Sequence, residues 1–267
     1  MQIEPGGPVS GKDMRDIQPV EIQQAGQHIL YDASLAIPVD RGPDAQWLLQ
    51  WFDAGYWRAR GSLKGEAQGR GSTLFFGFQD GEYVLRHYRR GGMVARLVTD
   101  RYIWTGLRNS RPWREWHLLA AAYEQGLPVP KPFAARLIKN GMFYTADLIT
   151  HRIAGGVPLA ESLTAGRQGQ AIWRNIGRII RRFHDAGIEH ADLNAHNILL
   201  AGDKAFLIDF DRGRMHAGNN FQKRMDRWRR RNLQRLLRSL NKLGRQRQTF
   251  HFSSGDWRHL LEGYGAA

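Results

Sequence analysis

Three side chains at fixed intervals constrain this chain more than any other feature of its sequence. Asp192 and Asn197 stand five positions apart, and Asp209 follows 17 positions after Asp192, at the end of the short apolar run AFLI. A loop that carries Asp and Asn, followed by a strand that ends in Asp, supplies a carboxylate to orient a hydroxyl and oxygen ligands for Mg²⁺. Phosphoryl transfer needs these groups and little covalent chemistry from the protein. The spacing therefore predicts a phosphotransfer site.

The order of these residues resembles the catalytic and metal-binding loops of the protein-kinase-like fold. The pattern H-x-D-x-x-x-x-N ends at Asn197, and Ile-Asp-Phe follows around Asp209. The resemblance implies an α+β fold of two lobes, a β-rich N-lobe and a mainly helical C-lobe, with ATP between them. It also implies that Asp192 orients the acceptor hydroxyl and accepts its proton, while Asn197 and Asp209 hold Mg²⁺.

A glycine-rich turn precedes the first predicted β-hairpin. Gly69, Gly71 and Ser72 come just before two strand-like segments at 73–78 and 82–88. In a kinase-like fold such a turn covers the nucleotide phosphates, although this one lacks the full G-x-G-x-x-G. The resemblance therefore assigns the three residues to ATP binding.

Arg86 stands on the second strand of this hairpin, where kinases carry a phosphate-binding Lys. Its expected partner is Glu115, early on a helix predicted over 111–126. Arg keeps the charge of Lys but offers a planar fork in place of a point charge. Regulated protein kinases carry Arg and Gly where this chain has Ala191 and Asp211, so the departures favour a small-molecule kinase. Asp211 itself is interpreted as a loop residue without a role.

Longer segments narrow the resemblance to one family. Five of them together resemble the 3-deoxy-D-manno-octulosonic acid (Kdo) kinase family of lipopolysaccharide core biosynthesis, over roughly residues 45–240: QGRGSTLFF at 68–76, YVLRHYRRGG at 83–92, GLPVPKP at 126–132, HADLNAHNILL at 190–200 and LIDFDRGR at 207–214. The resemblance implies ATP-dependent phosphorylation of the 4-hydroxyl of Kdo on a Kdo-bearing lipid A precursor. It also implies a peripheral protein at the cytoplasmic face of the inner membrane. A lipopolysaccharide heptose kinase, or another small-molecule kinase of the same fold, is the alternative.

Positive charge gathers in one segment outside the predicted catalytic loops. The chain has 39 Lys and Arg against 25 Asp and Glu, a net charge of +14, and residues 221–247 hold eleven of those cations and a single acid. Apolar residues there fall on one half of a helical wheel, which predicts a basic amphipathic helix over 221–243 that ends near Gly244. We expect its apolar face to pack on the core and its basic face to meet an anionic inner-membrane surface or substrate.

A function of another class, a basic nucleic-acid- or membrane-binding module without catalysis, would also explain this charge. Such a module has no need of Asp192, Asn197 and Asp209, so we expect no nucleic-acid partner. The chain contains no Cys, which excludes thiolate nucleophiles and Cys-ligated metals. His184 and His190 belong to a six-residue His repeat that fits no continuous helix or strand face. We therefore expect no zinc site, and we expect His190 to support the catalytic loop.

The rest of the sequence sets the expected domain boundaries. Residues 1–45 are predicted to form a loosely ordered N-terminal arm with one early strand, followed by a β-rich N-lobe over 46–150 and a helical C-lobe over 151–267. A helix is predicted over 46–56, strands over 133–139 and 142–149, and a helix over 170–187. No apolar run is long enough to span a bilayer, and the N-terminus lacks the pattern of a secretory signal.

Overall fold

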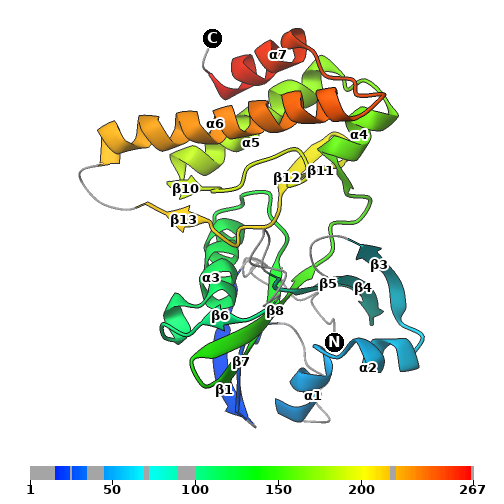
Figure 1. Cartoon of the computed structure of the whole chain (residues 1–267), viewed down its shortest axis with the longest axis vertical. Helices are drawn as coiled ribbons and strands as arrows, with labels where there is room; N and C mark the ends of the chain where they lie inside the picture. The colour runs from blue at the N-terminus through cyan, green and yellow to red at the C-terminus, as the bar shows by residue number, and fades with distance from the viewer. Residues whose placement is uncertain are drawn as a thin grey trace, which may run out of the picture.

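A computed structural model shows two lobes, one built on a β-sheet and the other on helices (Figure 1). It describes residues 16–24, 26–34, 45–68, 72–89, 100–216 and 221–265. The sheet lies in the first part of the chain, and the long helices of the second part stack above it in the figure. The predicted division into a β-rich and a helical part is present.

The first lobe contains an antiparallel sheet of eight strands in the order β1-β2-β7-β8-β5-β4-β3, with β6 paired to β8. The predicted hairpins are confirmed as β4–β5 and β7–β8. The strands are β1 (Pro19–Gln24), β2 (Gln27–Asp32), β3 (Leu63–Gln68), β4 (Ser72–Phe78), β5 (Gly81–His87), β6 (Tyr102–Ile103), β7 (Pro132–Asn140) and β8 (Phe143–His151).

The N-terminal arm differs from its prediction, because two strands of it join the sheet. β1 pairs with β2, and β2 pairs with β7. A buried carboxylate closes the end of this hairpin: Oδ1 of Asp32 accepts hydrogen bonds of 2.9 Å from the backbone N–H groups of Gln18 and Ser34. Lys131, just before β7, forms an ion pair of 2.9 Å with the same carboxylate. A long-range partner therefore orders a segment that looks weakly patterned by itself.

The two faces of the sheet belong to different cores. Successive side chains of a strand point to opposite faces. Ala135 and Leu148 contribute to the core shared with the helical lobe, while Ala134 and Ile149 contribute to an outer, aromatic core. In the outer core Trp51 lies in the turn that divides the helix predicted over 46–56 into α1 and α2. Trp51 is one of six tryptophans of the chain that are almost completely buried.

The second lobe is mainly helical and carries short strands near the catalytic sequence. The predicted helices at 111–126 and 170–187 are confirmed as α3 and α5. Among the described residues, the helices of the first lobe are α1 (Ala45–Gln50), α2 (Ala54–Ala59), the short 3-10 helix η2 (Leu107–Asn109) and α3 (Arg111–Glu124). Those of the second lobe are α4 (Leu159–Ala165), α5 (Gln170–Asp185), α6 (Phe221–Gln246) and α7 (Ser254–Tyr264). The short strands are β9 (Val157–Pro158), β10 (Ile188–Glu189), β11 (Ile198–Ala201), β12 (Lys204–Leu207) and β13 (Arg214–Met215).

Helices α5 and α7 cross at two glycines. A Cβ atom on Gly177 would lie 2.0 Å from the backbone oxygen of Leu260, and one on Gly263 would lie 2.0 Å from the backbone oxygen of Arg174. Contacts this short exclude any side chain, so glycine at both positions lets the two backbones touch.

The predicted basic helix is confirmed as α6, but it continues past Gly244 to Gln246. Gly244 does not adopt the left-handed conformation that ends many helices, so the helix passes through it and ends two residues later. The apolar face packs as expected, with Leu236 and Leu240 fully buried in the core of the lobe. In Figure 1, α6 crosses the full width of the helical lobe.

Candidate active site

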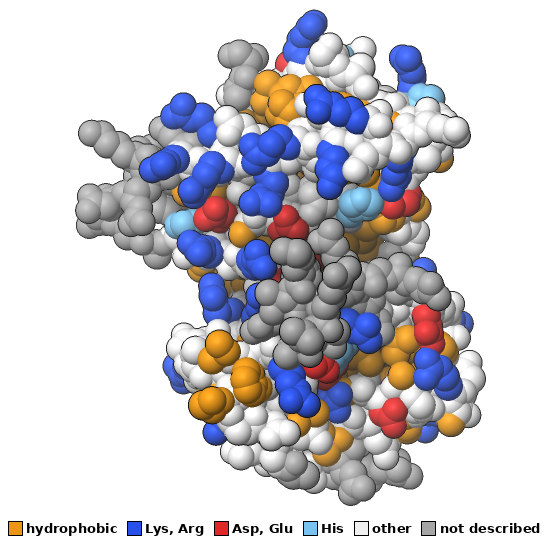
Figure 2. All heavy atoms as spheres, in the orientation of Figure 1, with side chains coloured by type: hydrophobic (Ala, Val, Ile, Leu, Met, Phe, Trp, Pro, Cys, Tyr) orange, Lys and Arg blue, Asp and Glu red, His pale blue; other side chains and the backbone are white. Residues whose placement is uncertain are grey.

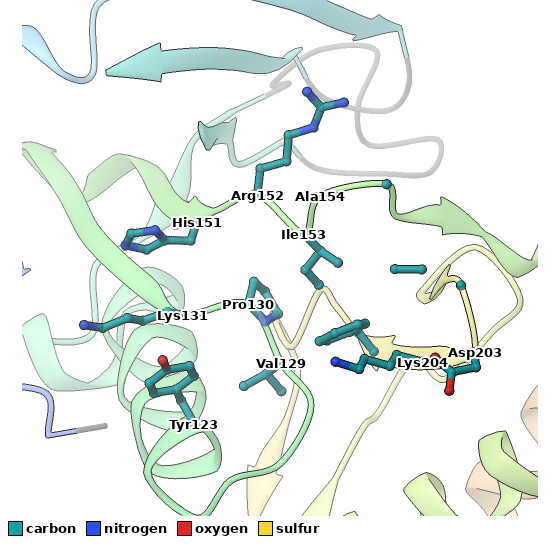
Figure 3. Close-up of a pocket in the computed structure, with 14 residues that line it drawn as sticks. Tyr123, Val129, Pro130, Lys131, His151, Arg152, Ile153, Ala154, Asp203 and Lys204 are labelled. Atoms are coloured by element: carbon teal, nitrogen blue, oxygen red, sulfur yellow. The ribbon is translucent and has the colours of Figure 1, made fainter. Parts of the chain in front are cut away.

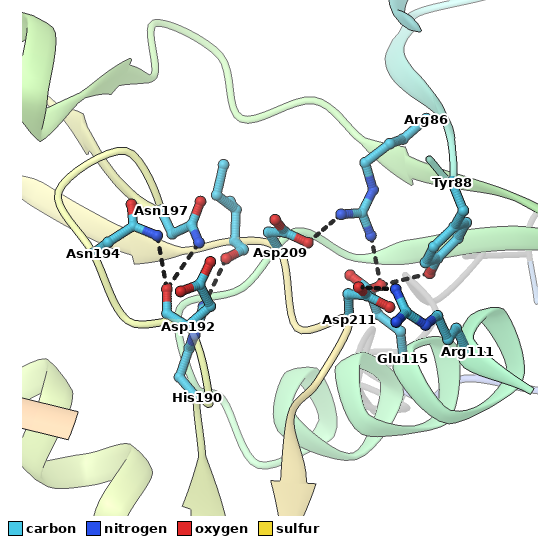
Figure 4. A network of polar contacts seen from close by, with 11 residues as sticks. Arg86, Tyr88, Arg111, Glu115, His190, Asp192, Asn194, Asn197, Asp209 and Asp211 are labelled. Atoms are coloured by element: carbon cyan, nitrogen blue, oxygen red, sulfur yellow. Dashed lines mark hydrogen bonds and ion pairs between the residues drawn. The ribbon is translucent and has the colours of Figure 1, made fainter. Parts of the chain in front are cut away.

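The loop between β10 and β11 presents the carboxylate of Asp192 to solvent. Side-chain nitrogens of Asn194 and Asn197 donate hydrogen bonds of 2.8 and 3.0 Å to the backbone oxygen of Asp192 (Figure 4). These bonds hold the backbone of Asp192 and leave its carboxylate 56% exposed. A carboxylate in this position is accessible to a hydroxyl group of a bound molecule.

His190 joins this loop to the segment that ends in Asp209. Its Nε2 lies 2.8 Å from the backbone oxygen of Ile208. Burial lowers the pKa of His190, so the ring is neutral near pH 7 and Nε2 donates to that oxygen. His190 therefore supports the catalytic loop as expected. Within the described ranges, no three His, Cys, Asp or Glu side chains gather as a metal cluster.

Arg86 connects the two lobes through its guanidinium. Its Nη2 lies 2.5 Å from Oε2 of Glu115, and its Nη1 contacts Oδ1 of Asp209. Strand β5, helix α3 and the segment after β12 thus converge on one cation (Figure 4). The predicted pairing of Arg86 with Glu115 is present, and the planar fork explains how one side chain reaches both carboxylates.

Burial and charge act in opposite directions on these groups. Burial raises the pKa of Glu115 to about 7, although Arg86 opposes this shift. Burial also disfavours the charge of Arg86, but Glu115 and Asp209 outweigh it and hold the pKa of Arg86 well above its ordinary value. Burial likewise opposes ionisation of Asp209, and Arg86 nonetheless keeps its pKa below the usual range. Asp209 is therefore ionised near pH 7.

Two neighbours of this cluster were not foreseen from the sequence. The hydroxyl of Tyr88 donates a hydrogen bond of 2.5 Å to Glu115. Asp211, interpreted from the sequence as a loop residue without a role, has a partner in the fold, because its Oδ2 lies 2.8 Å from Nη1 of Arg111 at the start of α3. Burial raises the pKa of Asp211. The signal for Tyr88 was present in the sequence, since residues two apart on a strand share a face.

Asp209 has an unusual backbone conformation. Its φ angle is 64°, in the left-handed region that residues other than glycine seldom adopt. Such strain concentrates at functional sites, where the surrounding structure holds it in place. Here the strained residue, Asp209, is the one that pairs with Arg86.

A cavity of about 370 Å³ lies between the lobes and ends at these charges. Its apolar walls include Val84, Leu148 and Leu199, and its polar end includes Arg86, Asn197 and Asp209. A lining of apolar side chains with a few charged and amide groups suits a flat ring with an anionic tail. Among the residues assigned to nucleotide binding, Gly69 and Gly71 lie outside the described residues, and the side chain of Ser72 does as well.

A larger hollow of about 720 Å³ is lined in part by the segment that follows β8, from His151 to Gly155 (Figure 3). The two hollows share Pro130, His151, Arg152 and Ile153. None of the candidate site residues lines the larger hollow. The smaller cavity is therefore the one connected to the charged cluster.

Helix α6 supports the catalytic loop directly. The backbone N–H of Ala195 donates to Oγ of Ser239 at 3.2 Å, and Nη1 of Arg235 lies 3.2 Å from Oδ1 of Asp192. The sequence suggested a basic segment apart from the catalytic loops. The fold instead places one of its arginines against Asp192.

Comparisons with known proteins agree with this geometry. Residues 54–264 match the family described as "Lipopolysaccharide kinase (Kdo/WaaP) family". Three similar proteins are each named 3-deoxy-D-manno-octulosonic acid kinase. The protein of Actinobacillus succinogenes is 40% identical over 80% of this chain and 90% of its own length. The protein of Haemophilus influenzae is 42% identical over 80% and 90%, and that of Stenotrophomonas maltophilia is 42% identical over 87% and 90%.

Proposed function

Because the chain belongs to the lipopolysaccharide kinase (Kdo/WaaP) family, we propose that it transfers the γ-phosphoryl group of ATP to the 4-hydroxyl of Kdo on a Kdo-bearing lipid A precursor. The observation that carries the proposal is the convergence of Arg86, Asn197 and Asp209 at one end of the cavity between the lobes. A hydrogen bond from Asn197 joins this end to the loop of Asp192.

Asp192 is the catalytic residue of this proposal. Its exposed carboxylate orients the acceptor hydroxyl and takes its proton while the oxygen attacks the γ-phosphorus. A new oxygen–phosphorus bond forms, and the bond to the β-phosphate oxygen breaks, so that ADP leaves. The asparagines on the backbone oxygen of Asp192 keep the carboxylate in place during this step.

Arg86 binds the phosphates of the nucleotide, and Glu115 positions Arg86. A guanidinium that is paired with buried Glu115 has little freedom, so less entropy is lost when it binds phosphate. The apolar walls of the cavity receive the base of ATP. Gly69, Gly71 and Ser72 remain assigned to the same nucleotide as part of the proposal.

Asn197 and Asp209 fit a magnesium site. The amide nitrogen of Asn197 is bound to the oxygen of Asp192, so its side-chain oxygen is left for a cation. Asp209 is ionised and lines the same cavity. Mg²⁺ commonly takes one or two protein oxygens and completes its shell with phosphates and water. When bound, the ion would neutralise charge that develops on the transferred phosphoryl group.

The protein binds the anionic cytoplasmic surface of the inner membrane as a peripheral protein, and the basic face of α6 supports this part of the proposal. Exposed cations recur every three or four residues along the helix, which puts them on one side of it. Figure 2 shows Lys and Arg side chains in a row over this helix. We call this set the basic row: Arg227, Arg231, Arg235, Arg238, Lys242 and Arg245. No helix in the described ranges has the length and hydropathy needed to cross a bilayer.

A comparison of acceptors tests the proposal. Purified protein is incubated with radiolabelled ATP, Mg²⁺ and either a Kdo-bearing lipid A precursor or a heptose-bearing one. We expect label on Kdo alone. Transfer to heptose alone would replace the proposal by a heptose kinase, and transfer to neither acceptor would remove the kinase function and favour a binding module.

A further inference from the structure

Two hydrogen bonds between α6 and the catalytic loop, one on each side of Arg235 along the helix, fix the contact between Arg235 and Asp192. Helix α6 bonds to the catalytic loop one turn before Arg235, where Oδ1 of Asn232 accepts a 3.3 Å hydrogen bond from the backbone N–H of His190. It bonds again one turn after, where Oγ of Ser239 accepts from Ala195. The fold therefore places the guanidinium of Arg235 beside Asp192 by contacts independent of their charges.

The guanidinium of Arg235 is only partly used. It offers five N–H donors. Among the described residues, Asp192 is the one group that bonds to it, through a single Nη1 contact of 3.2 Å. Both side chains are about half exposed, 49% for Arg235 and 56% for Asp192. Structural ion pairs at such exposure contribute little stability, so this arginine has donors available for a ligand.

The surroundings of Arg235 favour an anion. Arg231 and Arg238 of the basic row flank it, one turn away on either side, and both are exposed. The carboxylate of Glu189 is already shared by His216, at 2.7 Å, and Arg231, at 3.8 Å. Cations thus outnumber anions on the side of Asp192 where α6 lies.

The acceptor of the proposed reaction is itself an acid, and this inference rests on that proposed function. In a 3-deoxy-octulosonic acid, carbon 2 carries the carboxylate, carbon 3 is the deoxy methylene and carbon 4 carries the reacting hydroxyl. The carboxylate therefore lies close to the hydroxyl that must reach Asp192. Nη1 of Arg235 is within hydrogen-bond distance of Oδ1 of Asp192, so the guanidinium lies beside the place where this hydroxyl must bind. A bidentate guanidinium–carboxylate pair matches these positions.

We propose that Arg235 binds the carboxylate of the Kdo acceptor and thereby determines the specificity of the protein for acidic sugar acceptors. Without the acceptor, Arg235 pairs with Asp192. When the sugar binds, its carboxylate takes the guanidinium, and Asp192 receives the sugar hydroxyl in its place. A neutral sugar has no group to make this exchange, so Arg235 stays on Asp192 and the acceptor is rejected.

The experiment compares two acceptors that differ only in charge: the Kdo-bearing lipid A precursor and the same molecule with its reacting Kdo carboxylate converted to the methyl ester. Steady-state kinetics are measured for the unmodified protein and for Arg235→Gln, Arg235→Lys and Arg178→Gln. Arg178 is an exposed cation of α5, outside the basic row, and serves as the matched control.

We expect the unmodified protein and Arg178→Gln to prefer the free acid by about 10- to 100-fold in kcat/KM. Arg235→Gln should lose this preference, because KM for the acid rises and because kcat/KM for the ester also rises once Arg235 no longer pairs with Asp192. Arg235→Lys should keep part of the preference, since it retains the charge without the fork. If Arg235 acted only through the net positive charge of the protein, Arg178→Gln would reduce the preference for the free acid by the same factor as Arg235→Gln.

If Arg235→Gln keeps the full preference for the free acid, the inference is overturned while the proposed function stands. If the unmodified protein phosphorylates neither acceptor, the proposed function is wrong, and the inference falls with it. Equal use of both acceptors by the unmodified protein would also overturn the inference.

Discussion

Nη2 of Arg86 lies 2.5 Å from Oε2 of Glu115, a residue 29 positions later in the chain. The other terminal nitrogen of Arg86 contacts Asp209. A strand, a helix and the end of a second-lobe strand are thus joined by one planar cation. A lysine ammonium is a single point charge on a flexible stem and would not offer two separate nitrogens to these carboxylates.

Replacing Arg86 by Lys tests the value of the fork. We expect Arg86→Lys to lower kcat/KM for phosphoryl transfer by about 10- to 100-fold, because the charge remains but one of the two carboxylate contacts is lost. Arg86→Met, without charge, should lose more. Steady-state kinetics with varied ATP give both values, and Arg101→Lys, at an exposed position, is the control. Unchanged kinetics in Arg86→Lys would show that the bridge has no part in nucleotide binding.

The stability of the sheet should depend on pH through His87. Nδ1 of His87 lies 2.7 Å from Oδ1 of Asp147, and this hydrogen bond raises the pKa of His87. A raised pKa in the folded state means that protonation stabilises the fold fully below the unfolded value of about 6.5, and that this stabilisation is lost as pH rises through the folded value.

Thermal unfolding of the unmodified protein and His87→Gln measures this effect. We expect the substitution to lower the Tm clearly at pH 6 and to lower it less at pH 9, because the stabilisation by protonated His87 decreases as pH rises. A difference in Tm that stays constant or widens between these pH values would contradict the assigned ion pair.

Two glycines of helical segments should respond to alanine in opposite ways. Gly177→Ala would put a methyl group 2.0 Å from the backbone of α7, so we expect a loss of about 3 kcal/mol or more in the free energy of unfolding. Gly244 lies in α6, where an added Cβ meets only a ring carbon of Phe250 at 3.6 Å. Gly244→Ala should therefore stabilise by roughly 0.5–1 kcal/mol. Denaturant unfolding measures both, and a neutral Gly177→Ala would contradict the close packing of α5 on α7.

Charge reversal of the basic row tests the membrane partner. In one variant Arg227, Arg238 and Lys242 are changed to Glu. It should lose activity on acceptor embedded in anionic vesicles far more than on a soluble Kdo acceptor, because only the vesicle surface binds several cations of the basic row at once. A matched variant with Lys64, Arg101 and Arg178 changed to Glu alters the net charge equally at exposed positions elsewhere. Equal losses on both acceptors in the first variant would remove the membrane from the proposal.

The catalytic loops could be predicted from sequence because their chemistry is local. Asp192 and Asn197 belong to one loop, and Asn197 bonds to the backbone of Asp192. Their spacing therefore carries the geometry directly. The Arg86–Glu115 pair was also predictable, through the resemblance to the kinase-like fold, in which a cation on a strand pairs with a Glu on the following helix.

Features that depend on distant packing could not be predicted. Strand β2 pairs with β7 and β1 pairs with β2, and Lys131 supplies a partner for Asp32 that the local sequence does not reveal. The contact between Arg235 and Asp192 joins residues 43 positions apart. Such a contact follows only from the way α6 packs across the loop.

The central claim is that the carboxylate of Asp192 carries out phosphoryl transfer to Kdo. Among the described residues, Arg235 alone bonds to this exposed carboxylate, so Asp192→Ala should fold normally. The measurement is the rate of phosphate transfer from ATP to the Kdo-bearing lipid A precursor, with circular dichroism as a check of folding and Asp203→Ala as a control at an exposed turn. We predict a loss of about 10²- to 10⁴-fold in kcat for Asp192→Ala and an unchanged rate for Asp203→Ala. Full activity in a folded Asp192→Ala protein would contradict the mechanism.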